Sequence, residues 1–384
     1  MQFRREAIEA KESTLIQIAM AAESVDNPYR LYYGESDMPT PDFICRAMDE
    51  AVRSGHTLYT ATAGHPQLRA TICEKFHSIQ GVQYRPTEVV CTVGAGMAIF
   101  LAIRACIGAG DNAIIIAPAF SVFASTVTVF GGEVREVPLT LEVGRFRLDL
   151  ERVRSAIDSR TRLLVVNSPS NPTGWVISLE EQRALWDLAV RHDILILSDE
   201  VYDRIVYDGD VAPSFARIAT DREHLLIVNS FSKTYNMTGW RLGYALGSER
   251  LINLMTKVEE FIISSPPAMI QQAGIAALRE GEPFIRSLRE QYLRRRQAVM
   301  DRLARVPGLF LPEAQGAFYA FPRIEGLADS MTFVKDLLRS TRVALAPGIA
   351  FGRHGEGYVR ISYASSESVL IPALDRFAEY MSKR

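Results

Sequence analysis

Residues 225–246, LLIVNSFSKTYNMTGWRLGYAL, decide how the chain is expected to fold and where its chemistry lies. The stretch begins with an apolar run that ends at Asn229, which is typical of a strand buried on both faces of a sheet. Lys233 is the first charged residue after the run, and Arg241 follows eight residues later. A lysine held where a buried strand gives way to a loop can lose hydration and become nucleophilic. The stretch therefore predicts a sheet with reactive side chains beyond the carboxyl end of a strand.

Four further apolar runs have the same character and predict further buried strands. They lie at residues 88–93, 113–118, 162–168 and 194–199. Helical patterns separate the runs, and one of them opens with Ser178 and Glu181 at the spacing of a capping box. Strands that alternate with helices predict an α/β fold with a largely parallel sheet and helices on both faces.

The length of 384 residues exceeds one ordinary core, so a large domain and a smaller one are expected. After Pro283 the sequence pattern changes and predicts one long charged helix followed by short strands, which fits an α+β unit. We predict a large domain over residues 46–282 and a small C-terminal domain over residues 283–384. Residues 1–45 are predicted to contribute to the small domain and to the cleft.

The composition is that of a globular protein, with 48% hydrophobic and 23% charged residues. A formal net charge of -2 gives no reason to expect nucleic acid or an anionic membrane as a partner. Residues 1–20 mix charges of both signs, so they are interpreted as neither a secretion signal nor a membrane span. The basic run at residues 294–296 is interpreted as a solvated helix face.

The four cysteines indicate a reducing compartment. Cys45, Cys73, Cys91 and Cys106 show no C-x-x-C spacing, and two of them lie in apolar periodic segments, as reduced core thiols do. The expected location is the cytoplasm.

A small-residue turn follows the first apolar run and leads directly into a helix. Gly94, Ala95 and Gly96 allow the backbone to approach a ligand, and a helix N-terminus presents free N–H groups to an anion such as phosphate. A dinucleotide fingerprint is a rival interpretation, but Ile99 stands where its third glycine belongs. A plain tight turn remains possible.

Polar residues also follow the next runs. Asn171 lies in a Pro- and Gly-rich turn and could serve that turn alone. Asp199 ends a strand, where a buried carboxylate is costly unless it meets a partner such as a cationic ring nitrogen. Capping a following helix is the alternative role for Asp199. Tyr202 lies three residues beyond it.

Together these signals describe a single ligand. A phosphate would lie at residues 94–96, Ser230 and Arg241, an acid for a ring nitrogen at Asp199, and an amine for an aldehyde at Lys233. This set matches pyridoxal phosphate, which needs a lysine for its aldehyde and a partner for its pyridinium.

The chain resembles the class I aminotransferases of the aspartate aminotransferase-like, fold-type I group, over nearly its whole length. The most specific pieces are YTATAGHPQLRA at residues 59–70, VVNSPSNPTG at 165–174, LSDEVY at 197–202 and SFSKTYNMTGWRLGYA at 230–245. The resemblance implies a large domain with a mostly parallel seven-stranded sheet and a smaller α+β domain. It also implies a homodimer with shared active sites and a ping-pong transfer of amino groups between L-amino acids and 2-keto acids.

The resemblance assigns catalytic and cofactor roles to five side chains. Lys233 matches the lysine that binds the cofactor aldehyde and shuttles the proton, and Asp199 matches the acid that keeps the ring nitrogen protonated. Tyr202 and Asn171 match donors to the phenolic oxygen of the ring. Phe120 stands where the family places an aromatic ring stacked on the cofactor.

Phosphate contacts are implied for Ala95, Gly96, Ser230 and Arg241. Tyr59 matches a tyrosine that reaches the phosphate of the neighbouring subunit. No metal is implied for the site.

Substrate contacts are implied for Arg360, which matches the arginine that binds the α-carboxylate, and for Gly34 and Asn171 nearby. The apolar strand around Arg360 already indicates that its guanidinium needs an anion. A structural carboxylate of the protein could be that anion instead.

The pattern does not support an acidic substrate. Some bacterial relatives carry a lysine at the position of Gly96, and others use an arginine from the partner subunit, where this chain carries KVEEFIISSPP at residues 257–267. Glu259 and Glu260 would repel a dicarboxylate if they faced the pocket, but both could lie on a solvated helix face. Neutral, aromatic and basic donors therefore stay open.

Two other functions share these motifs. β-Lyases and aminocyclopropane carboxylate synthases use the same lysine, acid and arginine for elimination. A regulator that senses the cofactor would need a DNA-binding domain ahead of the fold, and this chain offers only residues 1–30 there.

Overall fold

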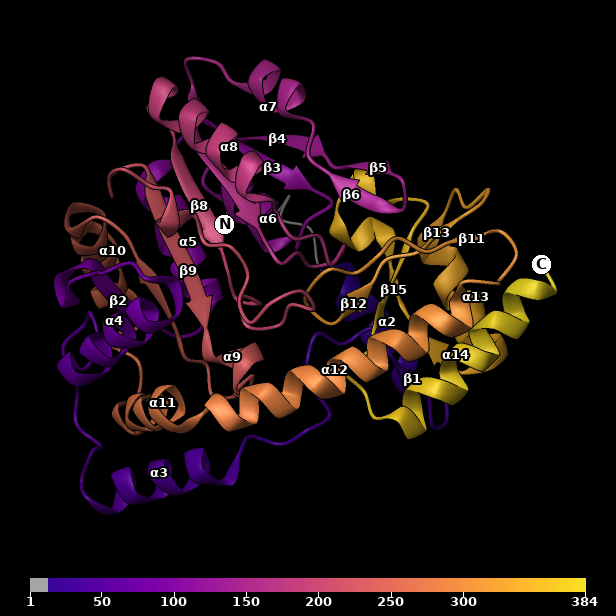
Figure 1. The fold of residues 1–384 in the computed structure, drawn as a ribbon, viewed down its shortest axis with the longest axis horizontal. Coiled ribbons are helices and arrows are strands. Elements are labelled where there is room, and N and C mark those ends of the chain that lie inside the picture. Colours follow the sequence, from indigo (N-terminus) through magenta and orange to yellow (C-terminus); the bar gives the residue numbers. More distant parts are fainter. Residues whose placement is uncertain (1–12) are drawn as a thin grey trace, which may run out of the picture.

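A seven-stranded sheet forms the centre of the structure (Figure 1). The structure is a computed structural model that describes residues 13–384, so the predictions on residues 1–12 lie outside the described residues. The strand order is β2-β10-β9-β8-β7-β3-β4. These strands are β2 (Val89–Thr92), β3 (Asn112–Ala117), β4 (Glu133–Pro138), β7 (Thr161–Asn167), β8 (Leu195–Asp199), β9 (Leu225–Ser230) and β10 (Gly243–Leu246). Neighbours are parallel except where β10 pairs antiparallel with β2 and β9. The predicted α/β class with a mostly parallel seven-stranded sheet is confirmed.

Helices cover both faces of this sheet. They are α4 (Pro66–Gln80), α5 (Ala95–Cys106), α6 (Val122–Val129), α7 (Leu150–Ala156), α8 (Leu179–His192), α10 (Glu249–Ile262) and α11 (Ala268–Glu280). Helix α3 (Asp42–Arg53) packs against α11, farther from the sheet (Figure 1). Helix α8 begins with the predicted capping box, in which Ser178 Oγ accepts from the Glu181 N–H and the Glu181 carboxylate accepts from the Ser178 N–H.

Successive residues of the central strands enter different cores, as the two-residue period of a strand requires. On β3, Ile114 and Ile116 join the core that contains Trp186 of α8. Ile115 points to the opposite face and joins the core that contains Phe123 of α6. Burial on both faces explains why the strands read as continuous apolar runs.

Two strands of the sheet were missed by the apolar-run criterion. The edge strand β4 alternates exposed, half-buried and buried residues, because only one of its sides is paired. The strand β10 is four residues long and begins at Gly243, directly after the turn that contains Arg241. The opening stretch is therefore a strand, a turn and a returning antiparallel strand.

The C-terminal part begins with the long helix α12 (Glu282–Leu303), which runs from α11 to the C-terminal helices (Figure 1). It continues through β11 (Leu309–Phe310), β12 (Tyr319–Ala320), β13 (Arg323–Ile324), α13 (Ser330–Thr341), β14 (Val343–Ala344), β15 (Ala346–Pro347), β16 (Val359–Ser362) and α14 (Glu367–Ser382). A small sheet has the order β12-β16-β15. The predicted long helix followed by short strands is confirmed.

The amino-terminal segment packs against this C-terminal part. Helix α2 (Thr14–Glu23) contacts α13 and β15, and β1 (Tyr29–Arg30) pairs parallel with β14. The short hairpin of β5 (Thr140–Glu142) and β6 (Arg145–Arg147) lies beyond β4.

The interpretation of residues 294–296 as a solvated helix face is wrong for Arg295. Arg294 is exposed, but the Arg295 side chain is 6% exposed and forms an ion pair with Asp37. Its neighbour Arg296 donates to Glu313 and to the Ala314 carbonyl. The partner that holds Arg295 inward, Asp37, lies 258 residues away along the chain, and a local charge pattern does not reveal it.

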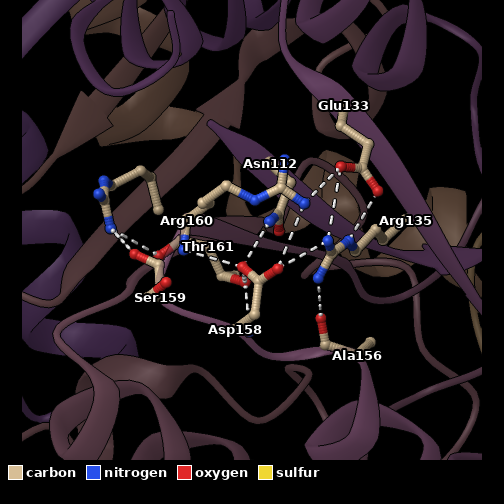
Figure 2. A network of polar contacts seen from close by, with 9 residues as sticks. Asn112, Glu133, Arg135, Ala156, Asp158, Ser159, Arg160 and Thr161 are labelled. Atoms are coloured by element: carbon tan, nitrogen blue, oxygen red, sulfur yellow. Dashed lines mark hydrogen bonds and ion pairs between the residues drawn. The ribbon is translucent and has the colours of Figure 1, made fainter. Parts of the chain in front are cut away.

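Ion pairs link the amino ends of β3, β4 and β7 (Figure 2). Arg135 Nη2 donates to Asp158 at 2.8 Å, Asn112 Nδ2 donates to the same carboxylate at 2.9 Å, and Arg160 joins Asp158 to Glu133. The Arg160 N–H and the Arg135 guanidinium hold the pKa of Asp158 well below its usual range. This network stabilises the edge of the sheet opposite the carboxyl ends of its parallel strands.

A second cluster attaches α12 to the central sheet. Glu282, the first residue of α12, accepts two hydrogen bonds from Arg204 in the loop after β8, at 2.7 and 2.9 Å. Lys75 of α4 approaches the same carboxylate at 2.6 Å. The Arg204 hydrogen bond and the Lys75 contact lower the pKa of Glu282 to about 2.

We predict that Glu282→Gln destabilises the fold by roughly 1–3 kcal/mol at pH 7, because buried Arg204 loses a charged partner. The stabilisation is present above the unfolded pKa of about 4.3 and is lost as the pH falls towards the folded pKa. The measurement is the urea midpoint of both proteins at pH 7 and at successively lower pH. Glu280→Gln, at an exposed residue two positions away, is the matched control. Equal midpoints for the two variants at pH 7 would contradict the role of this cluster.

Candidate active site

A cavity of about 360 Å³ lies beyond the carboxyl ends of β7, β8 and β9. It is lined by Leu15, Gly34, Ala95, Gly96, Ile99, Phe120, Val122, Asn167, Asn171, Asp199, Val201, Tyr202, Ser230, Ser232, Lys233, Arg241, Tyr319 and Arg360. Every predicted site residue except Tyr59 is in this lining. Parallel strands end at one edge of a sheet, which is why residues that follow separate strands meet here.

Lys233 enters the cavity from α9 (Phe231–Thr234), a single turn that directly follows β9. Its Nζ donates to the Gly34 carbonyl. Burial, together with the charges of Arg360 and Arg241, lowers the pKa of Lys233 to about 8 against the opposing charges of Glu35 and Asp199. The neutral fraction near neutral pH is far larger than that of an ordinary lysine, so this amine can act as a nucleophile and a base.

Asp199 ends β8 and is 5% exposed. One of its oxygens accepts from the Val201 N–H at 3.2 Å, but residues 201–204 form a turn, so Asp199 does not cap a following helix. Burial raises the pKa of Asp199 to about 7, against the hydrogen bond from Val201 and the charge of Lys233. No ion pair to Asp199 occurs within residues 13–384, so a cationic ligand group here would stabilise its charge.

Arg360 lies on β16 with 1% of its surface exposed. Nη1 donates to Asn171 Oδ1 at 2.8 Å, Nη2 donates to the Tyr32 carbonyl, and Nε has no hydrogen-bond partner among residues 13–384. The rings of Tyr319 and Phe351 lie 4.4 and 4.8 Å from the guanidinium carbon. The alternative of a structural carboxylate is not met, since no ion pair to Arg360 occurs in the described part of the chain. An anionic ligand would supply the missing charge.

A second cationic group lies over the glycine turn. A Cβ on Gly94, which has φ +75°, would lie 2.3 Å from Arg241 Nη2, so the guanidinium contacts the bare backbone. Helix α5 begins at the next residue, and Ser230 Oγ donates to Ser232 Oγ at 2.9 Å beside it. Backbone N–H groups, hydroxyls and a guanidinium in one place can bind a phosphate.

Sequence reasoning missed Tyr319, Asn167, Ser232 and Leu15. The Tyr319 hydroxyl hydrogen-bonds the Tyr202 hydroxyl at 2.9 Å, and an aromatic residue in a short apolar strand gave no sign of this. Asn167 Oδ1 accepts from the Asn171 N–H at 2.8 Å, and its place at the end of β7 was a signal that could have been used.

Tyr59 and Glu259 differ from the other candidates. Tyr59 is 90% exposed and lies outside the cavity of its own chain. The interpretation of Glu259 as part of a solvated face is wrong, because its side chain is 0% exposed and neither oxygen has a hydrogen-bond partner in the described part of the chain. Burial raises the pKa of Glu259 to about 8, which keeps it mostly protonated at neutral pH. Glu260 is exposed, and neither glutamate lines the cavity.

The described residues contain no cluster of three or more His, Cys, Asp or Glu side chains that could bind a metal. None of the helices between residues 13 and 384 is both long enough and apolar enough to span a membrane.

Comparisons with known proteins agree with this geometry. The family model for aminotransferase class I and II matches residues 29–377. An aspartate aminotransferase of Pyrococcus horikoshii is 37% identical over 369 residues, which are 95% of this chain and 94% of that protein. The aromatic-amino-acid aminotransferase 2 of Thermococcus litoralis is 36% identical over 94% of both chains. The structure of Thermus thermophilus aspartate aminotransferase with maleate has a TM-score of 0.92 at 37% identity and covers 99% of both chains. The chain therefore belongs to the class I and II aminotransferase family, and its enzyme class is that of an aminotransferase.

Proposed function

We propose that this chain uses pyridoxal 5'-phosphate to move an amino group from an L-amino acid to a 2-keto acid by a ping-pong mechanism. One observation carries the proposal: a single cavity joins a lysine of lowered pKa, a buried carboxylate and a buried arginine. When bound, the cofactor supplies an aldehyde for the amino group and a ring that withdraws electrons from the substrate carbon.

The residues of the cavity fit this cofactor. Arg241, the turn at Gly94 and the N-terminus of α5 offer a cradle for its phosphate, which a side chain at residue 94 would fill. Ala95, Gly96 and Ser230 would complete that cradle. Asp199 lacks an ion-pair partner within residues 13–384 and would keep a ring nitrogen protonated.

Lys233 would hold the aldehyde and, once displaced by the substrate amine, move a proton. Its Nζ would take the proton from the substrate Cα and return it to the reacting carbon of the cofactor. An amine whose pKa is about 8 suits both directions near neutral pH, and such transfer accelerates reactions roughly 10²- to 10⁴-fold.

Arg360 would bind the α-carboxylate of the substrate through its planar fork. Asn171 and the Tyr32 carbonyl orient the guanidinium, and the burial of Arg360 strengthens an ion pair with a ligand. Tyr202 and Asn171 would donate to the phenolic oxygen of the ring, and Phe120 would cover its face.

The substrate side chain is proposed to be uncharged. The cationic side chains in the lining are Lys233, Arg241 and Arg360, and each already has a role in the proposal. The lining left over is largely apolar and includes Leu15 and Val122. A distal carboxylate would find no further cation among the described lining residues.

A homodimer is part of the proposal, with Tyr59 reaching the phosphate site of the partner subunit. Leu58 and Phe261 are large apolar residues, 79% and 89% exposed. Gln271 donates to Thr60 Oγ1 at 2.9 Å and to the Pro266 carbonyl at 2.7 Å, so the loop that carries Leu58 lies beside the loop that follows α10, the helix that carries Phe261. Exposed apolar residues gathered on one face are typical of an interface between subunits.

The remaining parts of the proposal concern organisation. Residues 46–282 would form the cofactor-binding domain and residues 283–384 the small domain, with residues 1–45 added to the latter and to the cleft. The four free cysteines support a cytoplasmic location.

The first prediction from the proposed function concerns Lys233. Covalent attachment of pyridoxal phosphate, trapped with borohydride and read by mass spectrometry, should become faster as the pH rises through about 8, where the amine loses its proton. Lys233→Ala should abolish the trapped adduct, and Lys257→Ala, at an exposed residue, should not. A midpoint near that of a free lysine, about 10.4, would contradict the proposed burial of the amine.

The second prediction concerns the donor. Apolar and aromatic L-amino acids should exceed aspartate in kcat/KM by about tenfold or more, because an unpaired carboxylate would be costly in the cavity. The measurement is a kinetic panel of donors, with Lys233→Ala as the inactive control. Fast exchange with aspartate and 2-oxoglutarate and little with other donors would overturn this preference. Formation of ammonia in place of an aminated cofactor would instead indicate elimination.

The third prediction concerns the dimer. Phe261→Glu should raise the dissociation constant of the dimer by about tenfold or more, equivalent to ~1.4 kcal/mol, because a charge replaces an exposed apolar anchor. Analytical ultracentrifugation over a dilution series measures the change. Val143→Glu alters another exposed apolar residue, which lies in the β5–β6 turn and far from Phe261 along the chain. It should leave the dissociation constant of the dimer unaltered. An equal effect of both variants would place the interface elsewhere.

A further inference from the structure

Residues 31–37, hereafter the 31–37 segment, lie along the strand that carries Arg360. The Leu31 carbonyl accepts from the Ser362 N–H at 2.8 Å, and the Asp37 N–H donates to the Ala364 carbonyl at 3.0 Å. The segment is therefore fixed at both ends to β16 and to the residues directly after it.

The same segment offers carbonyl groups to two side chains of the site. The Tyr32 carbonyl accepts from Arg360 Nη2, and the Gly34 carbonyl accepts from Lys233 Nζ. A Cβ on Gly34 would lie 2.6 Å from the Tyr319 hydroxyl, so the segment has little room to move towards the cavity. Its position sets the orientation of the guanidinium and the amine together.

Arg295 of α12 closes the far end of the segment. Nη1 donates to Asp37 Oδ1 at 2.8 Å and to the Ala364 carbonyl at 2.9 Å, and Nη2 donates to Asp37 Oδ2 at 3.2 Å. One guanidinium thus binds the segment and Ala364, the second residue after β16, at the junction where these two already meet. Asp37 and Ala364 are not part of the cavity lining.

We propose that Arg295 is a positioning residue that holds the Tyr32 and Gly34 carbonyl groups in register with Arg360 and Lys233. The proposal rests on the proposed function for its kinetic consequences. A planar guanidinium that satisfies three acceptors fixes direction as well as distance, which a lysine or an apolar residue does not. A shift of about 1 Å in a positioning group can cost on the order of a hundredfold in rate.

The test uses the cofactor-loaded chain and the substitutions Arg295→Met, Arg295→Lys and Asp37→Asn. Arg295→Met should raise KM for the donor and weaken binding of the unreactive carboxylates succinate and 3-phenylpropanoate, measured by calorimetry, by about tenfold or more. Arg295→Lys should recover part of the loss. The pH midpoint for cofactor attachment by Lys233 should fall, because the Gly34 carbonyl stabilises the protonated amine less well.

The control is Arg294→Met, which alters the exposed neighbour on the same helix and should match the parent chain in every measurement. Adding Asp37→Asn to Arg295→Met should cause little further loss, because the two side chains act as one pair. If Arg295→Met does not fold, Arg295→Lys and Asp37→Asn carry the test.

A lower melting temperature with unchanged KM, carboxylate affinity and pH midpoint would overturn the proposal and leave Arg295 a purely structural role. A parent chain that binds the cofactor covalently but yields no keto acid would overturn the proposed reaction instead. The carboxylate affinities would then still decide the role of Arg295.

Discussion

Loss of water around charged side chains in one cavity governs the chemistry of this chain. Burial raises the pKa of Asp199 and lowers those of Lys233 and Arg360, and the last two repel each other. Within residues 13–384 neither Asp199 nor Arg360 forms an ion pair, and Lys233 offsets the charge of Asp199 only in part. Such an arrangement costs folding free energy, so it is expected where a ligand supplies the missing charges. A ligand with anionic groups and a cationic ring would relieve all of these costs together.

Several charged groups elsewhere in the fold are paired, in contrast to those of the cavity, and Glu259 is an exception that burial keeps mostly protonated. Glu282 is bound by Arg204 and Lys75, and Asp158 by several donors at the opposite edge of the sheet (Figure 2). Arg295 satisfies both oxygens of Asp37. These are ordinary structural ion pairs, in which each charged group meets an opposite charge within the fold. In the cavity, by contrast, Asp199 and Arg360 form no ion pair within residues 13–384, so a ligand could supply the opposite charges.

The sequence sufficed where the determining interactions are local. Buried strands read as apolar runs because both faces are covered, and Lys233 and Asp199 could be identified from their places after such runs. Arg295 and Glu259 were misread because the burial of a helical residue depends on the element packed against it, which a charge pattern does not encode. Tyr319 was missed for a related reason, since its partner Tyr202 is 117 residues away. The edge strand β4 lacks an apolar run because only one of its sides is paired.

The range of these contacts separates the residues proposed for cofactor binding from those proposed for substrate binding. Asp199 and Lys233 come from the ends of the adjacent strands β8 and β9, so their relative position is set by the hydrogen bonds of one sheet. Arg360 instead meets Asn171 and Tyr32 across 189 and 328 residues, where the C-terminal part and the amino-terminal segment approach the central sheet. A small displacement of the C-terminal part would therefore move Arg360, the proposed carboxylate clamp, and leave the adjacent strand ends that carry Asp199 and Lys233 in place. In the proposed reaction, substrate binding is the step most sensitive to how these parts pack against each other, because Arg360 meets Asn171 and Tyr32 only when they are in contact.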